Sequence, residues 1–425
     1  MDPSNKNRYQ FMSESQKSSP NADRHIPLLS VVIPTRNRAK YAISAIESIL
    51  TFTTDPRLEL VIQDNSDSRE LEQYVNENFG DDRLRYNYTE SRLACTENFN
   101  KAIALSTGEY ICIISDEDGI NPEIMVATSW ARDHDVDVIS LKHIPYYLWP
   151  DTEWQSTLFT QIEGGLLRIL ESFDGTFRPF DVSLNVHKYL RTTSVTDIEF
   201  VKLFHGILRR SCLETIYARN GFYLNALCID IYASMALSEV AKKAFLTYYP
   251  LTISGACNSN TEIHNPTGSR KDILDLAIQL RGSKGYKWDA LIPRFYSIET
   301  IIAESAIAAL RHNGRAELAE YFNIPRFIAL CFARCHKNRI AAISHIYRAD
   351  CSLNNSKIIT SFLFIYYLLI DTTTSFAKRL INRLRIFRDG EGVARYRGLG
   401  DMNEVTKALI NHLSKSGKRI ETYLP

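Results

Sequence analysis

Short apolar runs alternate with helix-like stretches of about a dozen residues between residues 28 and 141. The apolar runs lie at 28–34, 58–63, 84–88, 109–115 and 136–141. Strands that alternate with helices in this way indicate βαβ units, in which the strands are mostly parallel and helices cover the sheet. The sequence therefore predicts an α/β fold with a Rossmann-like, mostly parallel sheet.

Polar clusters follow three of these predicted strands. They read PTRNR at 34–38, QDNSDS at 63–68 and SDEDG at 115–119. In open parallel sheets ligands bind beyond the carboxyl ends of the strands. We therefore expect the three clusters to meet at one rim of the sheet and to form a binding site there.

The third cluster contains three consecutive acidic residues, Asp116, Glu117 and Asp118. Like charges repel one another, so an uncompensated acidic run at a strand end is not explained by stability. Carboxylate oxygens suit Mn²⁺ or Mg²⁺, which in turn bridge phosphate oxygens. The pattern predicts a DxD-type metal site, and an acidic turn that caps the following helix is the alternative.

The series VVIPTRNR, VIQDNSDS, ENFNKAIALSTGEYI and SDEDG resembles the inverting family-2 glycosyltransferases of the A-type fold. Order and spacing match over residues 28–145, and more loosely to about residue 265. The resemblance implies an A-type glycosyltransferase fold and metal-assisted transfer of a sugar, with inversion, from a nucleotide-sugar donor. It implies a UDP-sugar as donor and a saccharide or lipid-linked acceptor, as in polysaccharide biosynthesis.

The resemblance also assigns roles by position. Asp118 would bind the metal, and Asp116 would address the ribose or a metal-bound water. The residues implied to lie around the nucleotide-sugar are Pro34, Thr35, Asn37, Arg38, Asp64, Asn65, Ser66, Arg92, Asn98, Asp116 and Glu117. Turn chemistry is the alternative for Thr35 and Asn37, and an Asx-turn for Asp64. Arg36 stands where the family often has an aromatic residue.

Transfer with inversion needs a base that removes the proton of the acceptor hydroxyl. Asp230 is the candidate, because this carboxylate stands between apolar residues in NALCIDIYASMALS, at the expected start of a helix. The family places its base in a similar acidic motif about a hundred residues beyond the DxD motif. A plain helix N-cap is the alternative reading.

Two histidines are further candidates. His264, in GACNSNTEIHNPTG, lies where A-type enzymes often supply a further metal ligand or a loop that closes over the donor. The alternative is a histidine in a solvated loop. His205, beside Gly206, is predicted either to face the acceptor or to be a satisfied core histidine.

Composition and the N-terminal residues indicate the cellular compartment, the kinds of partner and the domain division. Residues 1–26 are polar and have no apolar h-region, which predicts a disordered leader rather than a secretory signal. Together with scattered cysteines this indicates a cytoplasmic protein. The net charge of +1 gives no indication of a nucleic-acid partner. We expect a catalytic domain over 27–268 and a mainly α-helical region over 269–425.

The C-terminal region contains an apolar run at 358–370, which is too short to span a bilayer. Residues 374–388 follow with apolar side chains at helical spacing and five cations. Such a basic amphipathic segment can lie in an anionic membrane interface. Residues 358–388 therefore predict either peripheral membrane contact or internal packing, and a helical region of this kind also suits a homo-oligomer interface.

Two other functions fit parts of the pattern. The domain could bind a glycan or a protein partner without catalysis. A sugar-phosphate nucleotidyltransferase would normally carry a glycine-rich phosphate loop after the first strand. Residues 34–37 contain no glycine, which disfavours that enzyme class.

Overall fold

The computed structural model describes residues 26–152, 164–170, 173–195, 198–258, 270–282, 285–348, 358–370 and 392–425. Several predictions from the sequence therefore fall outside the described residues. These are the leader up to residue 25, His264, and the part of the predicted membrane-contacting segment from residue 371 to residue 388.

The first part of the chain alternates strands and helices as predicted. Its elements are β1 (Leu29–Thr35), α1 (Ala39–Phe52), β2 (Leu58–Asp64), α2 (Glu70–Asn78), β3 (Leu84–Tyr88), α3 (Cys95–Leu105), β4 (Tyr110–Ile113), β5 (Gly119–Ile120), α4 (Ile124–Asp133) and β6 (Val138–Leu141). Every strand that the apolar runs predict is present, and only β5 is additional.

The rest of the chain adds short strands and a larger number of helices. The elements up to residue 256 are β7 (Tyr146–Leu148), β8 (Leu166–Leu170), β9 (Phe177–Pro179), α5 (Val182–Thr192), β10 (Ile207–Arg209), α6 (Arg210–Asn220), α7 (Ile229–Leu237), β11 (Ala244–Thr247) and β12 (Thr252–Ala256). Beyond them lie α8 (Arg270–Arg281), α9 (Ile298–His312), α10 (Ala316–Ala319), α11 (Ile324–Arg334), η3 (His336–Asn338), α12 (Arg339–Arg348), a helix over 358–370, β13 (Val393–Tyr396), α14 (Met402–Lys415) and η4 (Ile420–Thr422).

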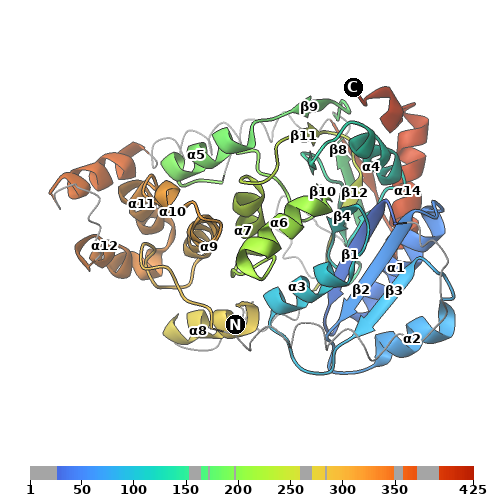
Figure 1. The fold of residues 1–425 in the computed structure, drawn as a ribbon, viewed down its shortest axis with the longest axis horizontal. Helices are drawn as coiled ribbons and strands as arrows, with labels where there is room; N and C mark the ends of the chain where they lie inside the picture. The colour runs from blue at the N-terminus through green and yellow to red at the C-terminus, as the bar shows by residue number, and fades with distance from the viewer. Residues whose placement is uncertain are drawn as a thin grey trace, which may run out of the picture.

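An eight-stranded sheet forms the centre of the α/β part, in the order β3-β2-β1-β4-β10-β6-β11-β9 (Figure 1). The pairs β3–β2, β2–β1, β1–β4 and β6–β11 are parallel. Strand β10 runs antiparallel to both of its neighbours, and β9 is antiparallel at the edge. The predicted α/β fold is confirmed, and the main sheet is mixed, with four parallel and three antiparallel pairs of neighbouring strands.

The two faces of this sheet pack against different sets of helices. Val31 and Ile33 of β1 belong to the apolar core that includes α1, α2, α4 and α14. Val32, between them, belongs to the core that includes α3, α5, α6, α7, α9 and α11. Side chains alternate between faces along a strand, so a strand covered on both faces is buried at every position and is mostly apolar. This explains why apolar residues from both faces follow one another in β1.

A second, five-stranded sheet has the order β13-β8-β7-β12-β5. Strand β5 begins directly after the acidic triplet, whereas β4 of the main sheet ends before it. The acidic turn thus connects the two sheets.

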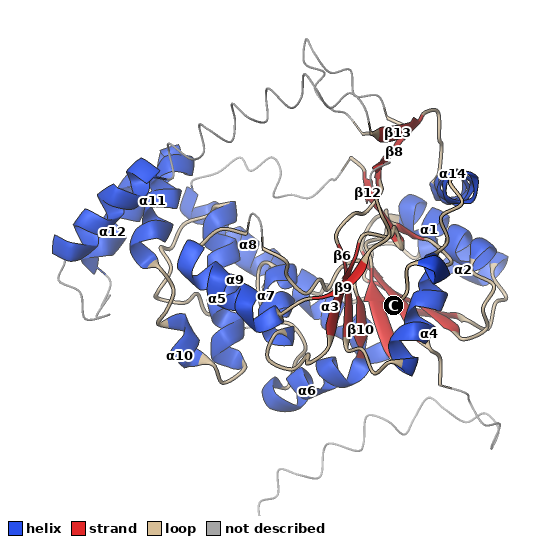
Figure 2. Cartoon of the chain, turned by 90° about the horizontal axis from the view of Figure 1, so that it is seen from above, coloured by secondary structure: helices blue, strands red, loops and turns tan. Residues whose placement is uncertain are grey.

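The last described segment, 392–425, returns to the α/β part of the molecule (Figure 2). Strand β13 pairs with β8. Helix α14 begins where the Asp401 carboxylate accepts a hydrogen bond from the amide of Glu404 at 2.9 Å, and its apolar face packs against α1. This segment, which the sequence grouped with the helical region, therefore packs on the α/β part of the molecule.

Helices dominate the described residues between 270 and 370, as predicted for the C-terminal region. They lie at one end of the longest axis of the molecule, with α5, α9, α11 and α12 grouped there (Figure 1). Among the described residues, no helix combines the length and the apolar character needed to cross a membrane.

Candidate active site

The acidic turn is held between the two sheets by Asp118. One carboxylate oxygen of Asp118 accepts a hydrogen bond from the Ser115 amide at 2.8 Å, and the other accepts one from the Gly255 amide at 2.7 Å. Gly255 lies on β12, and a Cβ atom at this position would overlap the carbonyl oxygen of Glu117. The close approach of β12 to the acidic turn therefore requires glycine at residue 255.

Asp116 and Glu117 are compensated by Arg38, which follows β1. Arg38 Nε lies 3.1 Å from an oxygen of Asp116, and its Nη2 atom lies 3.1 Å from an oxygen of Glu117. The other oxygen of Asp116 accepts a hydrogen bond from Thr35 Oγ1 at 2.6 Å. The acidic run is thus not uncompensated, because a cation from a neighbouring strand end lies against it. Arg38 also contacts Cys257, which follows β12.

Burial strongly affects the ionisation of the two aspartates. It raises the pKa of Asp116 well above the usual range for a carboxyl group, and Arg38 opposes this shift. Burial, and then the charge of Glu117, also raise the pKa of Asp118. A cation that binds both carboxylates would favour their ionised forms.

The carboxylates of the acidic turn do not form a complete metal cage by themselves. Within the ranges that the structure describes, no group of three or more His, Cys, Asp or Glu side chains is arranged to hold a metal ion. Mg²⁺ and similar ions are often bound by one or two carboxylates together with substrate phosphates. A metal held by Asp116 and Asp118 would therefore need further oxygen ligands, such as those of a bound diphosphate.

His205 reaches the acidic turn because β10 runs antiparallel between β4 and β6. The residues before β10 consequently lie at the carboxyl end of β4, where the His205 amide donates to the carbonyl of Ile113 at 2.9 Å. His205 Nε2 lies 3.4 Å from an oxygen of Asp118. Burial, with the nearby charge of Lys202, lowers the pKa of His205 to about 3, so its imidazole is neutral.

Asp230 lies next to the segment that carries His205. It stands in the first turn of α7, and the backbone amide of Phe204 faces its carboxylate. The side chain reaches solvent, but the protein around it displaces enough water to raise its pKa to about 6, against the effects of Phe204 and Lys202. The structure thus brings Asp230 near the acidic turn through the consecutive residues Phe204 and His205.

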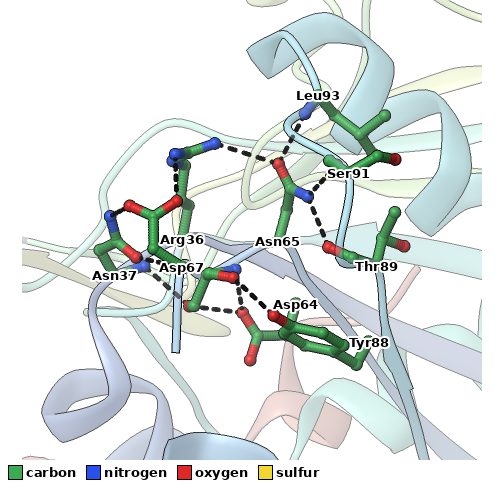
Figure 3. Close-up of polar contacts among 10 residues, drawn as sticks. Arg36, Asn37, Asp64, Asn65, Asp67, Tyr88, Thr89, Ser91 and Leu93 are labelled. Carbon is green, nitrogen blue, oxygen red and sulfur yellow. Dashed lines mark hydrogen bonds and ion pairs between the residues drawn. The ribbon is translucent and has the colours of Figure 1, made fainter. Parts of the chain in front are cut away.

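Asp64, predicted to contact the nucleotide base, is fully buried and accepts hydrogen bonds inside the protein (Figure 3). One carboxylate oxygen accepts from the Ser66 amide at 2.8 Å, which is the Asx-turn geometry considered from the sequence. The other oxygen accepts from the Tyr86 hydroxyl at 2.6 Å. Both oxygens are therefore engaged, and the residue is not exposed to solvent.

Asn65 joins the loops that follow β2 and β3. Its amide nitrogen donates to the carbonyls of Thr89 and Ser91 at 2.8 Å each, and its amide oxygen accepts from the Leu93 amide at 2.9 Å (Figure 3). Every polar atom of the Asn65 side chain is thus used to connect two rim loops.

Asn37 and Asp67 join the loops that follow β1 and β2. The Asn37 side chain donates to the Asp67 carboxylate at 2.7 Å and accepts from the Asp67 amide at 2.8 Å (Figure 3). Arg36 adds an ion pair with Asp67 at 2.7 Å. At the position where the family often has an aromatic residue, this arginine thus links the loops that follow β1 and β2. The three rim loops therefore form one hydrogen-bonded unit.

The remaining predicted site residues vary in their placement. Pro34 is buried on β1, and Asn98 of α3 donates to the Thr35 carbonyl at 3.2 Å. Arg92 is exposed on the loop after β3, within electrostatic range of Asp67.

Sequence reasoning missed two neighbours of the acidic turn, Gly255 and Trp149, whose indole nitrogen donates to the Glu117 carbonyl at 3.0 Å. An isolated glycine inside a strand signals a close backbone approach and could have pointed to Gly255. The sequence contains no comparable signal for Trp149.

The family model of glycosyl transferase family 2 matches residues 30–190. The chain is 37% identical over 97 residues to WcaA of Escherichia coli (strain K12), named as a colanic acid biosynthesis glycosyl transferase, and the match covers 23% of this chain and 34% of WcaA. It is 31% identical over 114 residues to the glycosyltransferase GlyG of Streptococcus pneumoniae serotype 4, covering 26% of this chain and 38% of GlyG. The chain thus spans about a third of the length of these curated relatives.

A solved structure of S. aureus TarS, residues 1–349 in complex with UDP-GlcNAc, aligns with 75% of this chain and 88% of that chain. The sequence identity is 16% and the TM-score is 0.41. A likeness at this level does not bear on the substrate.

Proposed function

We propose, from the match of residues 30–190 to the family model of glycosyl transferase family 2, that the protein transfers a sugar from a nucleotide-sugar to an acceptor. The proposed donor is a UDP-sugar, and the proposed acceptor is a saccharide or a lipid-linked glycan. The name of WcaA supports an acceptor from polysaccharide biosynthesis. The proposed stereochemical outcome is inversion.

The observation that carries the proposal is the placement of Asp116 and Asp118 at the carboxyl end of β4, within contact of residues from β1 and β12. Ligands of open α/β sheets bind at this rim. In the proposed complex the donor lies across the rim, between the hydrogen-bonded loops and the acidic turn.

Asp116 and Asp118 would hold Mn²⁺ or Mg²⁺, which supplies positive charge to the departing diphosphate. The protein orients both carboxylates before the donor binds. Thr35 donates to Asp116, whereas the Ser115 and Gly255 amides donate to Asp118. Arg38 already neutralises part of the acidic charge, which reduces the repulsion that an anionic diphosphate would meet.

Asp230 is the proposed base. Inversion requires proton removal from an acceptor hydroxyl on the face of the sugar opposite the leaving group. A pKa of about 6 leaves this carboxylate mostly ionised near neutral pH and makes it a stronger base than an ordinary aspartate. Asp230 also reaches solvent, so an acceptor has access to it.

Calorimetric titration of the full chain with a panel of nucleotides and nucleotide-sugars, with and without Mn²⁺, tests the proposal. We expect UDP binding that requires the metal, and loss of that dependence in Asp118→Ala. Asp133→Ala is the matched control, because Asp133 is an exposed aspartate on α4, away from the rim. Failure of every nucleotide to bind the wild-type chain would contradict the proposed donor site.

A non-catalytic binding protein is the second candidate function. The observation that favours it is that both oxygens of Asp64 are bonded within the protein, and that Arg38 lies against Asp116 and Glu117. Slow hydrolysis of a bound UDP-sugar by the wild-type protein, absent in Asp118→Ala, would exclude this candidate.

A further inference from the structure

The contact between Arg38 and the acidic turn brings charges together without forming hydrogen bonds. Arg38 Nε lies 3.1 Å from Asp116 Oδ1, and Arg38 Nη2 lies 3.1 Å from Glu117 Oε2. Within the part of the chain that the structure describes, Arg38 Nε and these two carboxylate oxygens are buried and make no hydrogen bond. Buried polar atoms normally have a hydrogen-bond partner. The three unsatisfied atoms therefore mark a place where a bound ligand can complete the contacts.

The position of the two aspartates does not depend on Arg38. The other oxygen of Asp116 accepts a hydrogen bond from Thr35 Oγ1 at 2.6 Å. Both oxygens of Asp118 accept hydrogen bonds from backbone amides. Arg38 thus contributes positive charge to the acidic turn, and it can move away while the aspartates keep their orientation.

The position of Arg38 in the chain gives its guanidinium a second partner when an anion binds at the rim. Arg38 immediately precedes α1, and no side chain caps the start of this helix by a hydrogen bond. The start of a helix attracts anions, and a guanidinium binds phosphate through two parallel N–H groups. A diphosphate bound at the rim would therefore attract Arg38 away from the acidic turn.

We propose that Arg38 and the metal compete for the negative charge of Asp116 and Glu117, so that metal binding releases Arg38 toward the diphosphate. This inference rests on the nucleotide-sugar function proposed above. Arg38 is then a positioning residue, which neutralises the acidic turn in the free protein and contacts the diphosphate once a divalent cation has taken its place. Because coupling between two ligands is reciprocal, metal and nucleotide should each raise the affinity for the other.

A permanent ion pair is the alternative role for Arg38. Removal of one partner of a buried ion pair disturbs the protein around the other, so Arg38→Gln would then weaken metal and nucleotide binding alike. Competition predicts effects of opposite sign. Metal alone should bind more tightly, because the repulsion from a nearby positive charge is lost. UDP in the presence of metal should bind more weakly, because a phosphate contact is lost.

Calorimetric titration of the full chain with Mn²⁺ alone, and with UDP in excess Mn²⁺, tests the proposal at pH 8, where few protons compete for the carboxylates. We expect Arg38→Gln to bind Mn²⁺ about tenfold or more tightly than the wild type, and UDP about tenfold or more weakly. Arg36→Gln is the matched control. The Arg36 side chain is 27% exposed and that of Arg38 is 25% exposed, but Arg36 pairs with Asp67. Arg36→Gln should leave the affinity for Mn²⁺ unchanged.

A second measurement uses the wild type and does not depend on the folding of a variant. Phenylglyoxal modifies accessible arginines, and mass spectrometry of peptides reports the modification of Arg38 and Arg36 separately. Mn²⁺ alone should accelerate modification of Arg38 but not of Arg36, and UDP added with Mn²⁺ should protect Arg38 again.

Two results would overturn the proposal: Mn²⁺ binding by Arg38→Gln that is no tighter than in the wild type, or modification of Arg38 that Mn²⁺ does not change. Failure of the wild type to bind UDP with Mn²⁺ would instead contradict the proposed donor site. The experiments with Mn²⁺ alone contain no nucleotide, so the two failures are distinguishable.

Discussion

Met402 provides a direct test of whether the C-terminal segment supports the acidic turn. It is the first residue of α14 and is fully buried. Its amide donates to Ser44 Oγ of α1 at 2.9 Å, and its side chain packs against Gly119, the residue after Asp118. A Cβ atom on Gly119 would lie 2.6 Å from Met402 Sδ, so the contact leaves no free space.

Met402→Ala removes the atoms that fill this space and leaves a cavity. Truncation of a fully buried methionine to alanine costs about 2–5 kcal/mol of folding free energy. We expect a loss in this range, together with weaker nucleotide binding because Gly119 loses its support. Met402→Leu is the control, since a swap that conserves volume costs less than about 1.5 kcal/mol.

Hydrogen exchange measured on peptides from α14 and from residues 110–120, together with urea unfolding, is the assay. Met402→Ala should increase exchange in both peptides, and Met402→Leu should leave both near the wild-type rate. If Met402→Ala stayed within about 0.5 kcal/mol of the wild type and exchange in 110–120 were unchanged, the inference that α14 supports the acidic turn would be refuted.

Three further predictions concern single residues. Gly255→Ala should weaken nucleotide binding by about tenfold or more and destabilise the fold by about 1–3 kcal/mol, because the added methyl group overlaps the Glu117 carbonyl; calorimetry and urea unfolding measure the two effects. Turnover should fall as pH drops through about 6, because Asp230 then becomes protonated. Asp230→Asn should abolish turnover while nucleotide affinity is retained. A pH profile of turnover that this substitution leaves unchanged would exclude Asp230 as the base. Burial raises the pKa of Glu304 in α9 to about 7, where it accepts a hydrogen bond from Tyr286. The pKa of Glu304 is higher in the folded than in the unfolded state, so the free energy of unfolding falls as pH rises toward 7. Glu304→Gln should therefore stabilise the protein by about 1–3 kcal/mol at pH 8 but not at pH 4. Denaturant midpoints measured at the two pH values test this.

The positions of the strands were predictable because their signal is local. A strand covered on both faces is mostly apolar, and β1 and β2 are buried at every residue over their whole length. The convergence of the polar clusters was also predictable, since carboxyl ends of parallel strands share one edge. The contacts of Thr35 and Arg38 with Asp116 confirm that the first and third clusters meet.

The orientation of individual side chains in the site was not predictable in the same way. A nucleotide contact of Asp64 stays a prediction, and the structure adds that its carboxylate accepts hydrogen bonds from Ser66 and Tyr86. Whether a carboxylate accepts an internal hydrogen bond or faces a ligand depends on a difference of a few kcal/mol. Partners such as Tyr86, which lies on a different strand, contribute to this difference and leave no mark in the local sequence.

The amino-acid sequence by itself determined the strands and helices of the first 141 residues, the acidic turn and the largely helical character of residues 270–370, because each depends on the periodicity of neighbouring residues. Only the tertiary structure decided that β10 runs antiparallel and carries His205 to Asp118, that β12 brings Gly255 against the acidic turn, and that α14 returns to pack on α1. These contacts join residues far apart in the chain. Their formation depends on how completely the whole chain buries its apolar surface, which no local pattern records.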